Sequence, residues 1–178
     1  MILIALGDLG AQSATPSQAV ACDAPPRSTA SIAALLARDI ATPAATTGGT
    51  TLPEGPATDP AFAAEMEGLV RRWLDCQNAG EPLRAWALFS DGYLHRLLSR
   101  TGDVVDSSLA TPTPITGEAA TLVAIEGERV LPDGRFGATV TIAYPSVPMP
   151  KRFFFYFTEE DGRLLIDGIL GEISFSVP

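Results

Sequence analysis

The sequence predicts an α+β domain in which helices come first along the chain and pack on an antiparallel sheet of about four to five strands. Apolar residues recur with a helical period up to about residue 98, and with a period of two after about residue 119. The stretches "PDG" at 132–134 and "EEDG" at 159–162 are strong hairpin turns, because glycine after aspartate permits positive φ. Helices followed by an antiparallel meander define the α+β class.

Residues 1–58 are predicted to be an N-terminal extension with one short amphipathic helix. Four aliphatic residues recur there at helical spacing: Ile32, Leu35, Leu36 and Ile40. They predict a helix over about 29–41, which stops before Pro43. The segment 42–58, "TPAATTGGTTLPEGPAT", has the composition of a linker. We therefore expect a domain over 59–178.

A long helix is expected to open this domain. Asp59 suits the N-cap, Pro60 the first helical position and Gly80 the position beyond the end. One apolar stripe follows the helix: Phe62, Met66, Leu69, Val70 and Trp73. The segment "EPLRAWALF" predicts a second, short helix, and residues 91–98 continue it.

Four strands are expected, at 119–130, 135–145, 151–158 and 163–175. The third strand contains "FFFYF", which is apolar on both faces, whereas a half-exposed strand alternates apolar and polar residues. One face must meet the helices. We expect the other face to be covered by a second subunit or by the N-terminal segment 22–41.

Charge and hydropathy exclude several classes of partner. The chain of 178 residues has a net charge of −9, and its arginines and single lysine never cluster beyond a pair. A nucleic acid or an anionic membrane surface needs a basic face, so neither is an expected partner. No apolar run approaches the roughly 20 residues of a membrane-spanning helix. The abundance of arginine and alanine is associated with bacterial genomes rich in GC.

The two cysteines, Cys22 and Cys76, leave two interpretations open. Free buried thiols are the usual state in the cytoplasm. A disulfide would tie the N-terminal segment to the long helix and close a loop of roughly 50 residues, stabilising the fold by about 4 kcal/mol. We expect the disulfide, and with it a secreted or cell-envelope protein whose signal peptide is absent or truncated in this sequence. Two cysteines and one distant histidine make no metal site, and no cofactor is expected.

The stretch "NAGEPLRAWALFSDGYL" after the long helix, together with "RLLIDGIL" in the last strand, resembles the nuclear transport factor 2-like superfamily. That superfamily includes ketosteroid isomerase-like and polyketide cyclase-like domains, and the resemblance spans about residues 59–175. It implies a cone-shaped, cystatin-like fold, whose strongly curved sheet surrounds an apolar pocket, and homodimers through the outer face of the sheet. The residues expected to line the pocket are Trp73, Trp86, Tyr93 and Phe155.

The candidate catalytic residues are few. Tyr93 lies on the apolar stripe of its helix, whereas Asp91 and His95 are four residues apart and are expected to form a solvated pair. Asp167 is the better candidate, because it lies among aliphatic residues of the last strand and would serve as a general base if it pointed into the cone. Tyr144 or Tyr156 would then supply the oxyanion donor. The alternative is that "IDG" forms a bend or bulge in which Asp167 bonds its own backbone and faces solvent.

These observations favour a non-catalytic domain that binds a small apolar ligand in the cone or associates with itself. One alternative is a small isomerase, dehydratase or hydrolase that uses Asp167 as its base. The second alternative is a purely structural interaction domain in which large side chains fill the cone. Neither a substrate nor a ligand is identified by the sequence.

Overall fold

The structure, a computed structural model, describes residues 22–38, 52–101, 111–113 and 119–171. Its helical elements come first: α1 (Thr29–Leu36), α2 (Pro60–Asn78), α3 (Pro82–Ala85), the 3-10 turn η1 (Trp86–Leu88) and α4 (Asp91–Thr101). Four strands follow: β1 (Thr121–Val130), β2 (Phe136–Ala143), β3 (Lys151–Glu160) and β4 (Arg163–Leu170). They form one antiparallel sheet in the order β1-β2-β3-β4. The predicted α+β class is confirmed.

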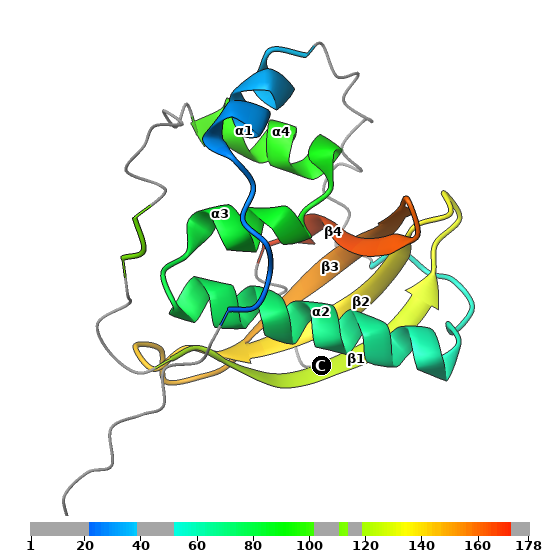
Figure 1. Ribbon diagram of the computed structural model, residues 1–178. Coiled ribbons are helices and arrows are strands. Elements are labelled where there is room, and N and C mark those ends of the chain that lie inside the picture. Colours follow the sequence, from blue (N-terminus) through cyan, green and yellow to red (C-terminus); the bar gives the residue numbers. More distant parts are fainter. Residues whose placement is uncertain (1–21, 39–51, 102–110, 114–118, 172–178) are drawn as a thin grey trace, which may run out of the picture.

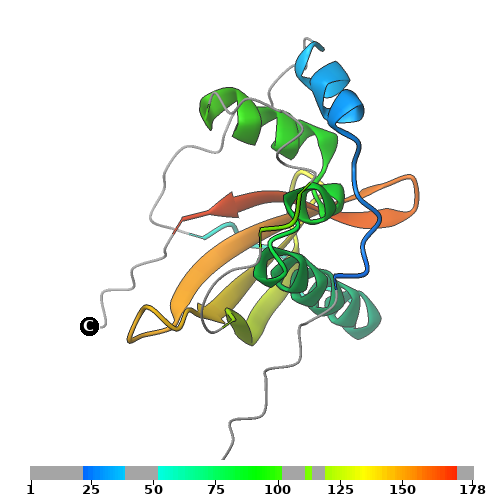
Figure 2. The same ribbon diagram turned by 60° about the vertical axis from the view of Figure 1, so that its left-hand side comes forward.

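The helices cover one face of the sheet, with α2 lying across the strands and α1 packed beside α4 (Figures 1 and 2). The ends of α2 follow the predicted local chemistry. The Asp59 carboxylate accepts a hydrogen bond from the Ala61 N–H at 2.8 Å, Pro60 is the first helical residue, and Gly80 has a φ of 66°. None of the described helices is long and apolar enough to cross a membrane.

The first helix is shorter than its pattern of apolar residues predicts. Ser28 caps α1 by accepting a hydrogen bond from the Ser31 N–H, and the helix ends at Leu36 instead of near residue 41. Ile32 and Leu35 are buried and belong to the same core as α2 and the sheet. Residues 42–51, the larger part of the predicted linker, lie outside the described residues, as do residues 39–41 of the predicted helix. The boundary between residues 58 and 59 stays a prediction.

Both sides of the sheet carry apolar clusters, as "FFFYF" predicts. Phe153, Phe155 and Phe157 belong to the main core beneath the helices. Phe154 and Tyr156 point to the outer face, where they form a second cluster with Leu131, and Leu52 packs against it. The expectation that segment 22–41 covers this outer face is wrong for the described residues 22–38, because α1 joins the main core on the opposite side.

The chain itself borders both edges of the sheet. Ala57 forms an antiparallel bridge with Arg129 on β1, and the Val130 N–H donates to the Pro56 carbonyl at 2.9 Å. At the other edge Phe89 forms a parallel bridge with Ile166 on β4. Segments before α2 and before α4 therefore continue the ladder for a short distance beyond each outer strand.

Two glycines provide a matched test of this packing. A methyl group on Gly137 in β2 would lie 2.4 Å from the Cζ atom of Phe154, whereas one on Gly68 in α2 would have no neighbour within 4 Å. We expect Gly137→Ala to lower the free energy of unfolding by about 1–3 kcal/mol through overpacking. Gly68→Ala should raise it by about 0.5–1 kcal/mol, since it restricts the unfolded chain and favours the helix. Urea denaturation of both variants measures these changes, and the same sign for both would contradict this description of the outer cluster.

Candidate functional site

Asp167 lies in a β-bulge of β4. The register between β3 and β4 shifts at this point, so that Tyr156 is opposite Gly168 and Phe157 is opposite Ile166. The bulge interpretation of "IDG" is thus confirmed. The rest of that interpretation is wrong, because the Asp167 carboxylate neither bonds its own turn nor faces solvent but reaches groups on two other elements.

Three side chains surround the Asp167 carboxylate. The Ser90 hydroxyl donates to Oδ1 at 2.6 Å, and Nη1 of Arg135 donates to Oδ2 at 3.1 Å. Nη2 of Arg96 lies 3.7 Å from Oδ1 and also donates to the Asp167 carbonyl at 2.8 Å. The Asp167 side chain is 15% exposed. Each carboxylate oxygen is therefore already engaged with a donor, and the residue connects α4, β4 and the start of β2.

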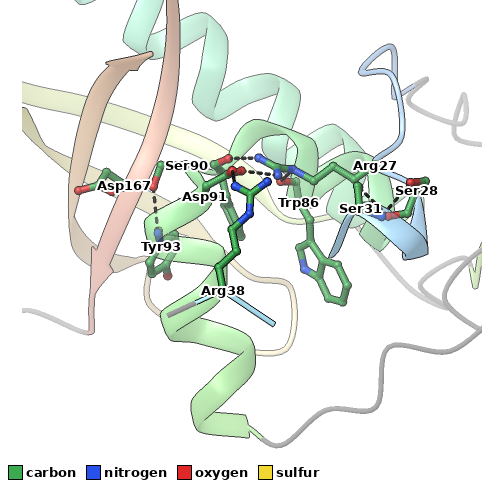
Figure 3. Close-up of polar contacts among 10 residues, drawn as sticks. Arg27, Ser28, Ser31, Arg38, Trp86, Ser90, Asp91, Tyr93 and Asp167 are labelled. Atoms are coloured by element: carbon green, nitrogen blue, oxygen red, sulfur yellow. Dashed lines mark hydrogen bonds and ion pairs between the residues drawn. The ribbon is translucent and has the colours of Figure 1, made fainter. Parts of the chain in front are cut away.

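Ser90 holds this arrangement in place. A serine directly before a helix is a local N-cap signal, but nothing in the local sequence points to its contact with Asp167. Its backbone N–H donates to the Ile166 carbonyl at 2.9 Å, and its hydroxyl oxygen accepts from the Tyr93 N–H at 3.0 Å. The same hydroxyl donates its proton to Asp167, as Figure 3 shows. Ser90 thus caps the first turn of α4 and fixes that turn to the bulge.

The two candidate tyrosines are placed differently relative to Asp167. Tyr156 is paired with Gly168, next to Asp167, but its ring belongs to the outer cluster and lies 4.4 Å from the Arg135 guanidinium. Tyr144 follows β2 at the opposite end, seven residues beyond Gly137, which pairs with Tyr156. That separation is about 20 Å along a strand, too far for Tyr144 to act on the same atom as Asp167. Burial raises the pKa of both phenols.

The aspartate, tyrosine and histidine of α4 do not form one site. Asp91 binds Arg27 at 2.6 Å and Arg38 at 3.6 Å, so the expected pair with His95 is wrong (Figure 3). Tyr93 packs against Phe89, with ring centroids 5.0 Å apart, and burial raises the pKa of its hydroxyl.

The four residues expected to line an apolar pocket lie close to the core. Phe155 is fully buried and packs edge-on against Trp73, with ring centroids 5.6 Å apart. Trp73 is 8% exposed, and its indole N–H has no acceptor among the described residues. Trp86 and Tyr93 are half-buried beside this core. Aromatic rings therefore pack directly around Trp73 and Phe155.

The predicted disulfide between Cys22 and Cys76 is confirmed, with the two Cα atoms 4.6 Å apart. It anchors a segment that we call the N-terminal strap, residues 22–28. Arg27 in the strap donates to the carbonyls of Trp86 and Phe89 at 3.1 and 2.8 Å. Arg84 in turn donates to the Ala24 carbonyl at 2.6 Å. One covalent bond and several polar contacts therefore fasten the strap across the helices.

Two cavities border the strap. The first, of about 460 Å³, lies between the strap and α3 and includes Pro26, Leu83 and Arg84. The second, of about 350 Å³, lies between the strap, α2 and the β3–β4 hairpin, and includes Ala24, Leu69 and Leu164. Neither cavity is lined by Asp167 or by the four predicted pocket residues.

The carboxylates near the β3–β4 hairpin influence one another. Burial, followed by Asp91 and Asp167, raises the pKa of Glu160, and Arg27 opposes this shift. Within the described part of the chain, no group of three or more histidine, cysteine or acidic side chains is arranged to hold a metal ion.

The fold and these sites define an α+β protein whose N-terminal strap is anchored by a disulfide to the helical layer. No protein-family model, curated protein or solved structure matches the chain. The resemblance to the nuclear transport factor 2-like superfamily therefore stays a prediction.

Proposed function

We propose that this chain is a non-catalytic domain of the cell envelope or the extracellular space, and that it associates with a second copy of itself through the outer face of its sheet. The observation that carries the proposal is the position of the exposed apolar side chains. Among the described residues, three large ones are exposed: Val123, Met149 and Leu170.

These three residues gather at one end of the sheet. Val123 lies near the start of β1, where Thr121 pairs with Ala143 at the end of β2. Met149 precedes β3 by two residues, and Leu170 pairs with Phe154 of the outer cluster. The register therefore places all three at the same end of the sheet, with Val123 and Leu170 on its two outer strands. They lie next to the outer cluster, whose Phe154 and Tyr156 are already buried within the chain itself.

The polar residues of this face suit contact with an identical surface. Arg152 of β3 and Glu126 of β1 lie beside the apolar residues, with 3.7 Å between Nη2 and Oε2. A twofold contact requires a self-complementary patch, and a patch with apolar residues and both signs of charge meets that requirement.

The packing of Trp73 on Phe155 supports association over enclosure of an apolar ligand at this place in the core. A binding pocket needs empty apolar volume of several hundred Å³. Phe155 and Trp73, which the resemblance assigns to the pocket wall, instead pack against each other. The engaged oxygens of Asp167 likewise support a structural role for this carboxylate over that of a general base.

The disulfide supports the proposed location, because such bonds persist in oxidising compartments. If thiols are blocked at lysis of the source cells, mass spectrometry should find Cys22 and Cys76 unmodified unless reductant is added first. Alkylation of both cysteines without reductant would contradict a secreted or envelope location.

Light scattering coupled to size-exclusion chromatography tests the association. We expect the wild-type chain to be a dimer whose fraction falls on dilution. Val123→Lys and Leu170→Lys should shift it to the monomer, because each places a charge in the apolar contact. Ala64→Lys, at an exposed position of α2, adds the same charge elsewhere and should leave the dimer intact. A wild-type monomer at every concentration would refute the proposal.

A further inference from the structure

The cavity between the strap, α2 and the β3–β4 hairpin is lined by leucines and by charged side chains of both signs. We call it the charged cavity; its volume is about 350 Å³. Six of its lining residues carry the inference: Asp23, Glu65, Leu69, Arg72, Leu88 and Arg163. They come from four segments that are far apart in the sequence, and Figure 1 shows the strap crossing in front of α2.

The floor of the charged cavity is apolar. Leu69 and Leu88 are almost fully buried, and Leu164 of β4 lies beside them with 7% of its surface exposed. These side chains belong to the main core, so the floor is fixed by packing on the helices and the sheet. A ligand side chain that contacts this floor would therefore meet a preformed apolar surface.

The rim carries two carboxylates and two guanidinium groups. Asp23 and Glu65 supply the carboxylates, and Arg72 and Arg163 supply the guanidinium groups. Within the described part of the chain, none of these four side chains forms a hydrogen bond or an ion pair. By contrast, other charged residues of α2 are paired. On α2 itself Arg71 binds Glu67 at 2.5 Å.

The fold sets the spacing of these charges. Glu65, Leu69 and Arg72 follow one face of α2, because they are separated by four and three residues. Glu65 and Arg72 are about 10 Å apart along the helix axis at 1.5 Å per residue. An extended dipeptide spans roughly 7 Å between its ends. A hydrogen bond of about 3 Å at one or both of these ends covers the rest of the distance between Glu65 and Arg72. The disulfide of Cys22 holds the neighbouring Asp23 at the same rim.

We propose that the charged cavity binds a short zwitterionic peptide with apolar side chains, of about dipeptide size. Asp23 and Glu65 bind the peptide ammonium group, and Arg72 and Arg163 bind its carboxylate. The leucine floor contacts the side chains. The rim is balanced in charge, so a ligand that carries both charges fits it, whereas a purely anionic or cationic ligand meets repulsion from one pair.

Isothermal titration calorimetry of the full chain, with its disulfide intact, tests this proposal with the dipeptide leucyl-leucine. We expect saturable binding at one site. N-acetyl-leucyl-leucine lacks the ammonium group and leucyl-leucine amide lacks the carboxylate, so each should bind at least tenfold more weakly. No binding of leucyl-leucine, or equal binding of the blocked forms, would overturn the proposal.

Two pairs of variants on α2 localise the site. Glu65→Gln and Arg72→Gln remove rim charges, and each should weaken binding at least tenfold. Glu67→Gln and Arg71→Gln remove the same charges from the same helix, outside the cavity lining, and should change the affinity less than twofold. Thermal melting verifies that all four variants are folded. Equal losses in both pairs would place binding elsewhere and refute the site. The outcome is independent of the oligomeric state of the protein.

Discussion

Loss of the Cys22–Cys76 disulfide is expected to lower the free energy of unfolding by about 4 kcal/mol. The bond joins residues 54 positions apart, and a loop of that length contributes about this much by restricting the unfolded chain. Cys22→Ala is the cleaner variant, since Cys22 is half-buried whereas Cys76 is fully buried. Urea denaturation followed by tryptophan fluorescence measures the change.

The reduced wild-type chain is the control for this prediction. Its stability should match that of Cys22→Ala to within about 1 kcal/mol, because both lack the bond and keep the remaining strap contacts. If either differs from the oxidised wild type by less than about 1 kcal/mol, Arg27 and the buried face of α1 hold the strap without the disulfide, and the expectation is wrong.

Asp167→Ala is expected to lower the free energy of unfolding by about 3 kcal/mol. The substitution leaves Arg96 and Arg135, which are 17% and 25% exposed, without this carboxylate. It also removes the acceptor of the buried Ser90 hydroxyl. Removing one partner of a largely buried ion pair has an effect of this size, because the remaining charge is left uncompensated.

Asp133→Ala is the matched control, since Asp133 binds the same Arg135 at 2.7 Å but is 51% exposed. We expect it to change stability by less than about 1 kcal/mol. Asp167→Asn should fall between the two, because the amide oxygen still accepts from Ser90. Equal losses for Asp167→Ala and Asp133→Ala, measured by chemical denaturation, would show that the bulge carboxylate is not a structural centre.

Structural features that depend only on residues adjacent in the sequence were predictable. The cap at Asp59, the turns at Gly134 and Gly162 and the bulge around Asp167 follow from local backbone chemistry, and each is present. The disulfide was expected for a different reason, because a bond between Cys22 and Cys76 ties the N-terminal segment to the long helix.

The polar site was not predictable, because its contacts join residues distant in the chain. Ser90 and Asp167 are 77 residues apart, and Arg27 and Asp91 are 64 apart. An i, i+4 spacing suggested a pair between Asp91 and His95, but an arginine from the strap offers charge together with several donors and is bound instead. Tertiary contact overrides the local pattern here.

The short bridges at Ala57 and Phe89 have a consequence for how copies of this chain can assemble. An unprotected outer strand offers its backbone to any other strand, and repeated addition produces fibrils. Here each outer strand is partly occupied by the chain itself, and β1 is further interrupted by two register shifts. In a twofold contact through the outer face of the sheet, the same patch of each copy is covered by the other, and no such patch is left for a third copy. The proposed dimer would therefore stop at two copies instead of extending into a fibril.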